Sequence, residues 1–172
     1  MIAHPQSIHR YSFRIYYEDT DAGGVVYHAN YLRYAERART EALRDAGIPH
    51  ADMVEQFGLM FMVHRAEIDY LRPALPDDLL VVETETMDVG GASVLLRQTI
   101  RGPNGVCVTL RIKLACVRIG GKKPGRIPPK WREAMLGLRR LDDAGDKMTR
   151  RRLDDAGDKM TRGRLDDANG SE

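Results

Sequence analysis

The chain has 172 residues, of which 42% are hydrophobic and 30% charged, and its basic and acidic residues leave a formal net charge of +2. This length predicts one domain with room for a tail, and the balanced charge argues against a nucleic-acid-binding protein. No apolar run approaches a membrane span, and the N-terminal residues lack the apolar core of a secretory signal. The two cysteines form no CxxC motif, which predicts neither a disulfide framework nor a metal site. We therefore expect a cytoplasmic protein.

The N-terminal third predicts a strand, a turn and a helix. Residues 10–17 alternate loosely and are rich in Tyr, Phe and Ile, which is typical of a strand. A turn cluster, EDTDAGG at residues 18–24, follows it. Apolar residues then recur at spacings of three and four over 31–46, which predicts a helix with Asn30 as its N-cap and Gly47 as its stop. Because alanine dominates its apolar stripe, this helix is expected to approach a surrounding sheet closely.

The rest of the body reads as strands and a short helix. Pro128-Pro129 favour a helix that runs through Leu138. Strand-like runs joined by hairpin-length turns cover residues 61–71, 79–87, 92–101 and 106–118. The order strand, helix, four strands predicts an α+β fold with one antiparallel sheet against one long helix.

The C-terminal segment is a repeat. RLDDAGDKMTR at 140–150 returns almost unchanged within 151–162, and RLDDA returns at Arg164. Each unit carries too few apolar residues to offset the entropy of ordering the chain. We therefore expect a folded domain over 1–139 and a disordered tail over 140–172.

The segment between the first strand and the long helix concentrates chemistry. Gly23 and Gly24 allow a ligand to approach the backbone closely, and free N–H groups at the start of a helix can bind an oxyanion. A carboxylate held nearby can act as a general base or a nucleophile. The alternative interpretation is an acidic turn in which Asp19 or Asp21 accepts hydrogen bonds from the backbone while the glycines fix the bend.

The run YYEDTDAGGVVYHANYLRYAERARTEAL at 16–43 resembles the opening of hotdog-fold acyl-CoA thioesterases of the 4-hydroxybenzoyl-CoA thioesterase family. It is most similar to the YbgC-like subfamily, which is associated with the Tol-Pal cell-envelope system. The resemblance extends over about residues 10–135 and includes EIDYLRPA at 67–74 and GRIPP at 125–129. It implies a hotdog fold, in which a five-stranded antiparallel sheet wraps one long helix and two protomers pair edge to edge as a homodimer or within a homotetramer.

The resemblance also implies the site. The family's catalytic carboxylate falls on Asp21, and the backbone N–H of His28 matches the oxyanion donor, while the His28 ring assists positioning or proton transfer. Asp21 either attacks the thioester carbonyl or activates water. Asp21 is followed here by Ala-Gly-Gly-Val-Val rather than the Pro-Ala-Gly-Ile-Val of the aromatic-substrate branch, which makes 4-hydroxybenzoyl-CoA a less favoured substrate. The remaining residues expected to contact substrate are Tyr17, Gly23, Gly24, Val25, Tyr27, Lys122, Lys123 and Arg126.

Several of these residues have a simpler alternative. The basic side chains of the turn at 122–126 contact the phosphates of coenzyme A or are merely solvated. Tyr17 borders the site or packs against the body, and packing is favoured. His64 is expected to be a core or interface histidine. Met and Phe side chains near residues 53–62 line an acyl pocket or fill the core, and core is favoured.

The expected function is hydrolysis of acyl-CoA to a free acid and coenzyme A, with no cofactor beyond the coenzyme A of the substrate. The expected partners are the substrate, a second copy of the chain and, as an alternative thiol carrier, acyl-carrier protein. The competing hypothesis is a hotdog scaffold that binds acyl groups or acyl-carrier protein near the cell envelope without cleaving them. A carboxylate beside Gly23-Gly24 favours the enzyme, because a binder does not need one.

Overall fold

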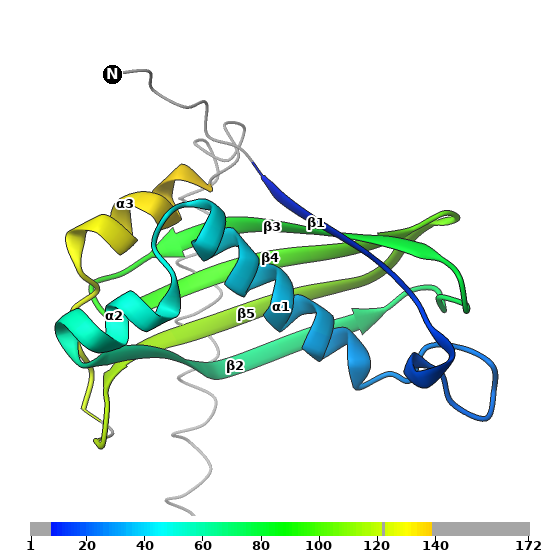
Figure 1. Ribbon diagram of the computed structural model, residues 1–172, viewed down its shortest axis with the longest axis horizontal. Coiled ribbons are helices and arrows are strands. Elements are labelled where there is room, and N and C mark those ends of the chain that lie inside the picture. The colour runs from blue at the N-terminus through cyan, green and yellow to red at the C-terminus, as the bar shows by residue number, and fades with distance from the viewer. Residues whose placement is uncertain (1–7, 122, 139–172) are drawn as a thin grey trace, which may run out of the picture. The chain divides into compact units, whose positions relative to one another are not determined.

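A computed structural model describes residues 8–121 and 123–138, and Figure 1 shows how their helices and strands are arranged. The elements in chain order are β1 (His9–Arg14), the short helix η1 (Tyr17–Asp19), α1 (Asn30–Asp45), α2 (His50–Phe57), β2 (Leu59–Tyr70), β3 (Leu79–Val89), β4 (Ser93–Gly102), β5 (Gly105–Arg118) and α3 (Pro129–Gly137). The expected α+β fold is confirmed.

The five strands form one antiparallel sheet in the order β1-β3-β4-β5-β2. The sequence-adjacent pairs β3–β4 and β4–β5 are joined by tight turns, as the Gly-rich segments between them predict. The strand β2 pairs only with β5, with Leu59 opposite Arg118 and Tyr70 opposite Val108. The two edges of the sheet are therefore the 6-residue β1 and the 12-residue β2.

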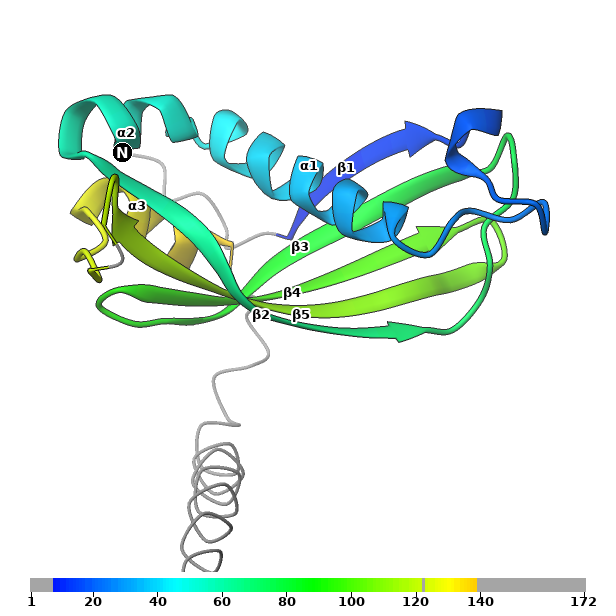
Figure 2. The ribbon, with the colours of Figure 1, turned by 90° about the horizontal axis from the view of Figure 1, so that it is seen from below.

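The helix α1 lies across one face of the sheet, with α2 and α3 near one end of it (Figures 1 and 2). Its buried stripe includes Ala35, Ala38 and Ala42, none of which is more than 3% exposed. Small side chains allow the helix to sit close to the sheet, and they form one hydrophobic core with larger residues of β3, β4 and β5. The expected alanine-lined contact is confirmed, except that Ala46 is exposed.

Two details differ from the sequence predictions. No element was predicted between Gly47 and residue 61, but this segment contains the helix α2, whose eight residues are too few to show a clear period. Asn30 is the first residue of α1 rather than its N-cap, which is Ala29. Gly47 does follow the end of α1 with φ +69°, as the predicted stop requires. The predicted tail at 140–172 lies outside the described residues.

One buried polar side chain joins the helix to the sheet. Gln98 of β4 is fully buried. Its amide nitrogen, Nε2, donates to the Ala35 carbonyl and to Thr84 Oγ1, both at 2.9 Å. Its Oε1 accepts a 2.9 Å hydrogen bond from the Arg39 guanidinium. The amide therefore links α1 to β3 and β4, and it gives the buried Thr84 hydroxyl a hydrogen-bond partner inside the protein.

We expect Gln98→Leu to lower the free energy of unfolding by about 2–3 kcal/mol, because it leaves Arg39 and Thr84 without their buried partner. Urea denaturation followed by circular dichroism measures the change. Gln56→Leu on the exposed surface of α2 is the matched control and should shift stability by less than about 0.5 kcal/mol. Equal effects of the two substitutions would contradict the role given to Gln98.

Candidate active site

The loop between β1 and α1 folds on itself through its backbone. The Asp21 N–H donates to the Val25 carbonyl and the Gly24 N–H donates to the Asp21 carbonyl, both at 3.0 Å. Thr20 and Val26 form an antiparallel bridge below this turn. Gly24 has φ +73°, a conformation that favours glycine. The loop is therefore a defined turn whose tip carries Asp21.

The Asp21 side chain is exposed at this tip, and one of its oxygens is committed to the turn. Asp21 Oδ1 accepts a 2.8 Å hydrogen bond from the Gly23 N–H. A Cβ atom at Gly23 would lie 3.1 Å from the same oxygen, so glycine at this position avoids a close contact with the carboxylate. For Asp21 Oδ1, the acidic-turn interpretation is therefore confirmed, because this oxygen accepts a hydrogen bond from the backbone. For Oδ2 there is no hydrogen-bond partner among the residues that the structure describes.

The start of α1 presents unused donors beside this turn. Neither the His28 nor the Ala29 backbone N–H has a hydrogen-bond acceptor within the described part of the chain. The His28 carbonyl accepts a 3.2 Å hydrogen bond from the Tyr70 hydroxyl, and the His28 ring lies 4.5 Å from the Tyr27 ring, centroid to centroid. His28 is thus held through its carbonyl, while its N–H has no partner among the described residues and the residue is exposed. This is the arrangement that an oxyanion donor needs.

Asp19 fixes the loop to the helix. Its carbonyl accepts hydrogen bonds of 2.9 Å from the Tyr27 N–H and from Asn30 Nδ2, and its Oδ2 accepts one from the Tyr16 N–H. The buried Tyr34 hydroxyl lies next to it; burial raises the pKa of Tyr34, and the Asp19 carboxylate raises that pKa further. The acidic-turn interpretation already named Asp19 as an acceptor from the backbone, and its Oδ2 has this role. The sequence predictions missed the contacts of the Asp19 carbonyl with the start of α1. The polar residue Asn30 is only 8% exposed and donates to the loop instead of capping the helix.

The other predicted contact residues of the loop are close to Asp21 in the chain but differ in exposure. Gly23, Gly24 and Tyr27 are exposed, and Val25 is half-buried. Tyr17 is 83% exposed, so the expectation that it packs against the body is wrong. The other expected role of Tyr17, contact with the substrate, stays a prediction.

The structure does not bring the basic turn to this loop within one chain. Lys123 and Arg126 are exposed and follow the end of β5, where Arg118 pairs with Leu59. The loop lies at the other end of the strand pair, where Tyr70 pairs with Val108. Ten residues of strand separate the two ends, about 33 Å at 3.3 Å per residue. Lys122 lies outside the described residues. The predicted phosphate contact stays a prediction.

The burial of His64 and of the methionines tests the roles expected for them. His64 is exposed on β2 at a register shift between Val63 and Arg65, so it is not a core histidine of this chain. Met53 is fully buried, as a core residue should be, whereas Met62 is 53% exposed. Core is therefore the wrong role for Met62.

Residues 8–121 and 123–138 contain neither a cluster of metal ligands nor a membrane-spanning helix. No group of three or more His, Cys, Asp or Glu side chains in these ranges is placed to hold a metal ion. No helix in the same ranges has the length and apolar character to cross a membrane.

Comparison with known proteins identifies the family of this chain. The sequence pattern of the thioesterase superfamily matches residues 23–109, which include His28 and the whole of α1. The chain belongs to the thioesterase superfamily. It is accordingly a thioester hydrolase, built on the five-stranded hotdog sheet that its solved relatives share.

The relatives that this thioesterase resembles align with more than two thirds of the chain. The chain is 44% identical to acyl-CoA thioesterase YbgC of Haemophilus influenzae over 126 residues, which are 73% of this chain and 93% of that protein. It is 37% identical to acyl-CoA thioester hydrolase YbgC of an Escherichia coli strain over 71% of this chain and 91% of that protein. A probable thioesterase from Bartonella henselae superposes with a TM-score of 0.67 at 37% identity, covering 71% of this chain and all of that one.

We expect Asn30→Asp to reduce thioester hydrolysis by about tenfold or more, because a carboxylate cannot donate to the Asp19 carbonyl and a misplaced loop costs catalysis. The turnover number on a thioester substrate and the thermal unfolding midpoint are measured together. Asn104→Asp, in an exposed turn, is the control. Unchanged turnover by a folded Asn30→Asp variant would show that the loop does not need this hydrogen bond.

Proposed function

We propose that this thioesterase hydrolyses acyl-CoA, with Asp21 as the catalytic carboxylate and the His28 N–H as the oxyanion donor. The observation that carries the proposal is the pair of backbone N–H groups of His28 and Ala29 at the start of the 16-residue α1, which have no acceptor among the described residues. They lie beside a turn that presents the Asp21 carboxylate. The relatives named as acyl-CoA thioesterases support coenzyme A as the thiol.

The chemistry follows from the charges that develop at the thioester. Either an Asp21 oxygen or a water molecule that gives its proton to Asp21 adds to the carbonyl carbon. The carbonyl oxygen becomes negative and is stabilised by the N–H of His28 and by the positive end of α1. The C–S bond then breaks, and the thiol of coenzyme A leaves after taking up a proton. In the nucleophilic route, water hydrolyses the resulting acyl-aspartyl anhydride. The exposed His28 ring assists positioning or proton transfer.

We also propose that two copies pair through the free edge of β2. The opposite edge, β1, has six residues and carries charged side chains on its exposed face, including Arg10 and Arg14, which protect an edge from pairing. The 12-residue β2 instead exposes apolar side chains, with Met62 and Val63 53% and 54% accessible. A long edge with exposed apolar groups favours pairing with a second strand. Antiparallel pairing of β2 with itself extends the sheet across both copies.

This pairing has a consequence for the basic turn. In an antiparallel pair, the Leu59 end of each β2 lies beside the Tyr70 end of the other. The exposed Lys123 and Arg126 follow the strand that pairs with Leu59, and Tyr70 contacts His28. The basic turn of one protomer is therefore directed toward the loop of its partner, where these cations and Lys122 can bind the phosphates of coenzyme A. The cytoplasmic location, the Tol-Pal association and acyl-carrier protein as an alternative partner stay predictions.

We expect Asp21→Asn to lower turnover of acyl-CoA by about 10²–10⁴-fold with the fold intact, because the amide neither attacks nor accepts the proton. Release of free thiol is followed spectroscopically, and circular dichroism reports the fold. Glu18→Gln removes a neighbouring exposed carboxylate of the same acidic cluster and should keep near-normal turnover. Near-normal hydrolysis by Asp21→Asn would exclude Asp21 as the catalytic carboxylate.

We expect Met62→Lys to shift the protein toward the monomer, because a charge on the apolar edge opposes pairing. Light scattering after size-exclusion chromatography gives the mass. Ser12→Lys places the same charge on the exposed edge β1 and should leave the assembly unchanged. If Ser12→Lys dissociates the assembly and Met62→Lys does not, the pairing edge is β1.

A further inference from the structure

The side chain of Tyr70 reaches the start of α1 from the end of β2. Its hydroxyl donates a 3.2 Å hydrogen bond to the His28 carbonyl, and its ring lies edge-on to the His28 ring with 6.3 Å between the ring centroids. The two residues are 42 positions apart in the chain. The contact therefore joins the sheet to the segment that carries the N–H groups of His28 and Ala29.

The surroundings of Tyr70 fix the position of its hydroxyl. Its backbone pairs with Val108 of β5, and the N–H of the following residue donates to the Cys107 carbonyl at 2.8 Å. Its ring lies 5.9 Å from the ring of Tyr31, at an angle of 70°, and Tyr31 is only 2% exposed. Because the strand and the ring are both held, the hydroxyl stays directed at His28.

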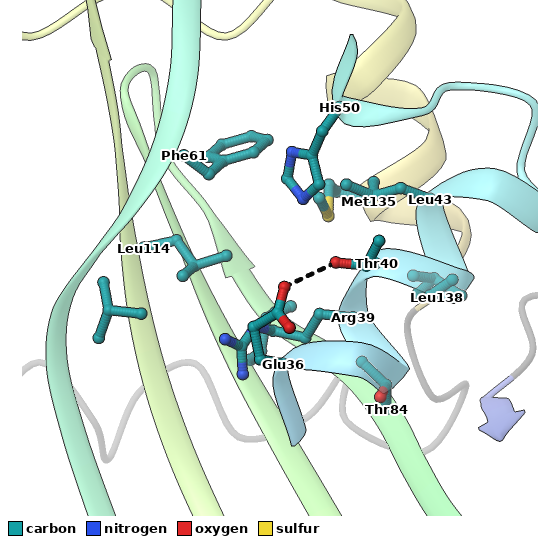
Figure 3. A pocket seen from close by; sticks show the side chains of 13 residues that line it. Glu36, Arg39, Thr40, Leu43, His50, Phe61, Thr84, Leu114, Met135 and Leu138 are labelled. Carbon is teal, nitrogen blue, oxygen red and sulfur yellow. Dashed lines mark hydrogen bonds between the residues drawn. The ribbon is translucent and has the colours of Figure 1, made fainter. Parts of the chain in front are cut away.

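A cavity of about 130 Å³ lies farther along α1, between this helix and the sheet (Figure 3). Its charged side chains are already engaged, because Glu36 accepts a 2.9 Å hydrogen bond from the Thr40 hydroxyl and Arg39 donates to Gln98. Glu36 also lies eight residues after His28, which is about 12 Å along a helix. These charged groups are therefore too remote to act at the start of α1, where the hydroxyl from β2 is in contact.

The hydrogen bond from Tyr70 acts on the peptide that supplies the Ala29 N–H. The His28 carbonyl and the Ala29 N–H belong to one planar peptide group, so a bond that fixes the carbonyl also fixes the direction of the N–H. The preceding peptide, which supplies the His28 N–H, is fixed in the same manner, because the Tyr27 carbonyl accepts a 2.9 Å hydrogen bond from the Asn30 N–H. The helix thus orients one of these two donors, and Tyr70 orients the other.

A hydrogen bond at the carbonyl of a peptide also strengthens its N–H as a donor, because neighbouring hydrogen bonds polarise one another. The bond from Tyr70 therefore makes the Ala29 N–H a better donor to a negative oxygen. Such a donor contributes most where the charge on the oxygen is largest, which is in the transition state. The hydroxyl should consequently influence the chemical step more than the binding of substrate.

We propose that Tyr70 is a positioning residue of the active site, which directs the Ala29 N–H to the oxyanion of the thioester as a second donor beside the His28 N–H. The inference rests on the proposed acyl-CoA hydrolysis. Tyr70 acts through the peptide and not on the reacting atoms, since its hydroxyl proton is bonded to the His28 carbonyl.

Tyr70→Phe removes the hydroxyl and keeps the ring that packs against Tyr31. Loss of a whole oxyanion donor lowers kcat by about 10²–10³-fold, so loss of its support should lower kcat by about tenfold, with KM changed less than about twofold. Tyr11→Phe in β1 is the matched control and should keep the wild-type kcat, because the Tyr11 hydroxyl has no hydrogen-bond partner among the described residues. An unchanged kcat in Tyr70→Phe, or a rise in KM alone, would overturn the proposal.

A double-mutant cycle tests whether the hydroxyl acts through Ala29. Lactic acid in place of Ala29 turns the amide into an ester, which removes the N–H and should lower kcat at least about tenfold. In that background Tyr70→Phe should cost less than about twofold, because the donor that it supports is gone. Lactic acid in place of Ala51, an exposed alanine in the first turn of α2, is the control and should leave the full effect of Tyr70→Phe. An undiminished effect of Tyr70→Phe in the Ala29 ester would place the action of the hydroxyl elsewhere.

Infrared spectroscopy separates this inference from the proposed function. The probe is an acyl-CoA with an isotope-labelled carbonyl, bound to Asp21→Asn so that it is not consumed. Donors at the carbonyl oxygen lower the stretching frequency, and we expect a smaller lowering when Tyr70→Phe is added. A Tyr70-dependent frequency in a protein that hydrolyses no acyl-CoA would refute the proposed function and support the role of Tyr70. Hydrolysis with a frequency that is independent of Tyr70 would refute the role of Tyr70 alone.

Discussion

The position at which α1 begins is the constraint on which the rest of the site depends. Asp19 accepts hydrogen bonds from Tyr27 and from Asn30, so the loop and the first turn of the helix are joined at one carbonyl. This junction leaves the N–H groups of His28 and Ala29 free within the described residues. If the helix began one residue later, these donors and the Asp21 turn would be rotated away from each other by about 100°.

The body of the protein holds this helix by close packing and by one polar contact. Alanines on the buried stripe bring α1 against the sheet, where a larger side chain would force it away. Gln98 then fixes its rotation, because its amide bonds both the Ala35 carbonyl and Arg39. The same Arg39 lines the cavity, so the contact that orients the helix also shapes the space beside it. Helix position, site and cavity are consequences of one interface.

The sequence predicted the parts of this structure that local patterns determine. Alternation identified β3, β4 and β5, and the alanine stripe predicted a helix wrapped by a sheet. The helix α2 was missed because eight residues do not show a reliable period. The position of Tyr70 and the distance of Lys123 from the loop were not predictable, since both depend on the pairing of β2 with β5, which joins residues 38 to 59 positions apart in the chain. Asn30 was wrongly predicted to be the N-cap of α1, because an asparagine at the start of a helix looks the same in the sequence whether it caps the helix or donates to a neighbouring loop.

The exposure of Asp21 and His28 bears on the proposed role of a second chain in the site. Hydrogen bonds to a developing oxyanion and a carboxylate acting on a carbonyl are strong only where water is excluded. In the single chain both residues lie at the surface, and one Asp21 oxygen is already bonded to Gly23. Substrate alone covers one side of such a turn. The proposed pairing through β2 would add a second protein surface near Tyr70. That surface would lower the local dielectric constant and so strengthen the interactions that we propose for this carboxylate and these N–H groups.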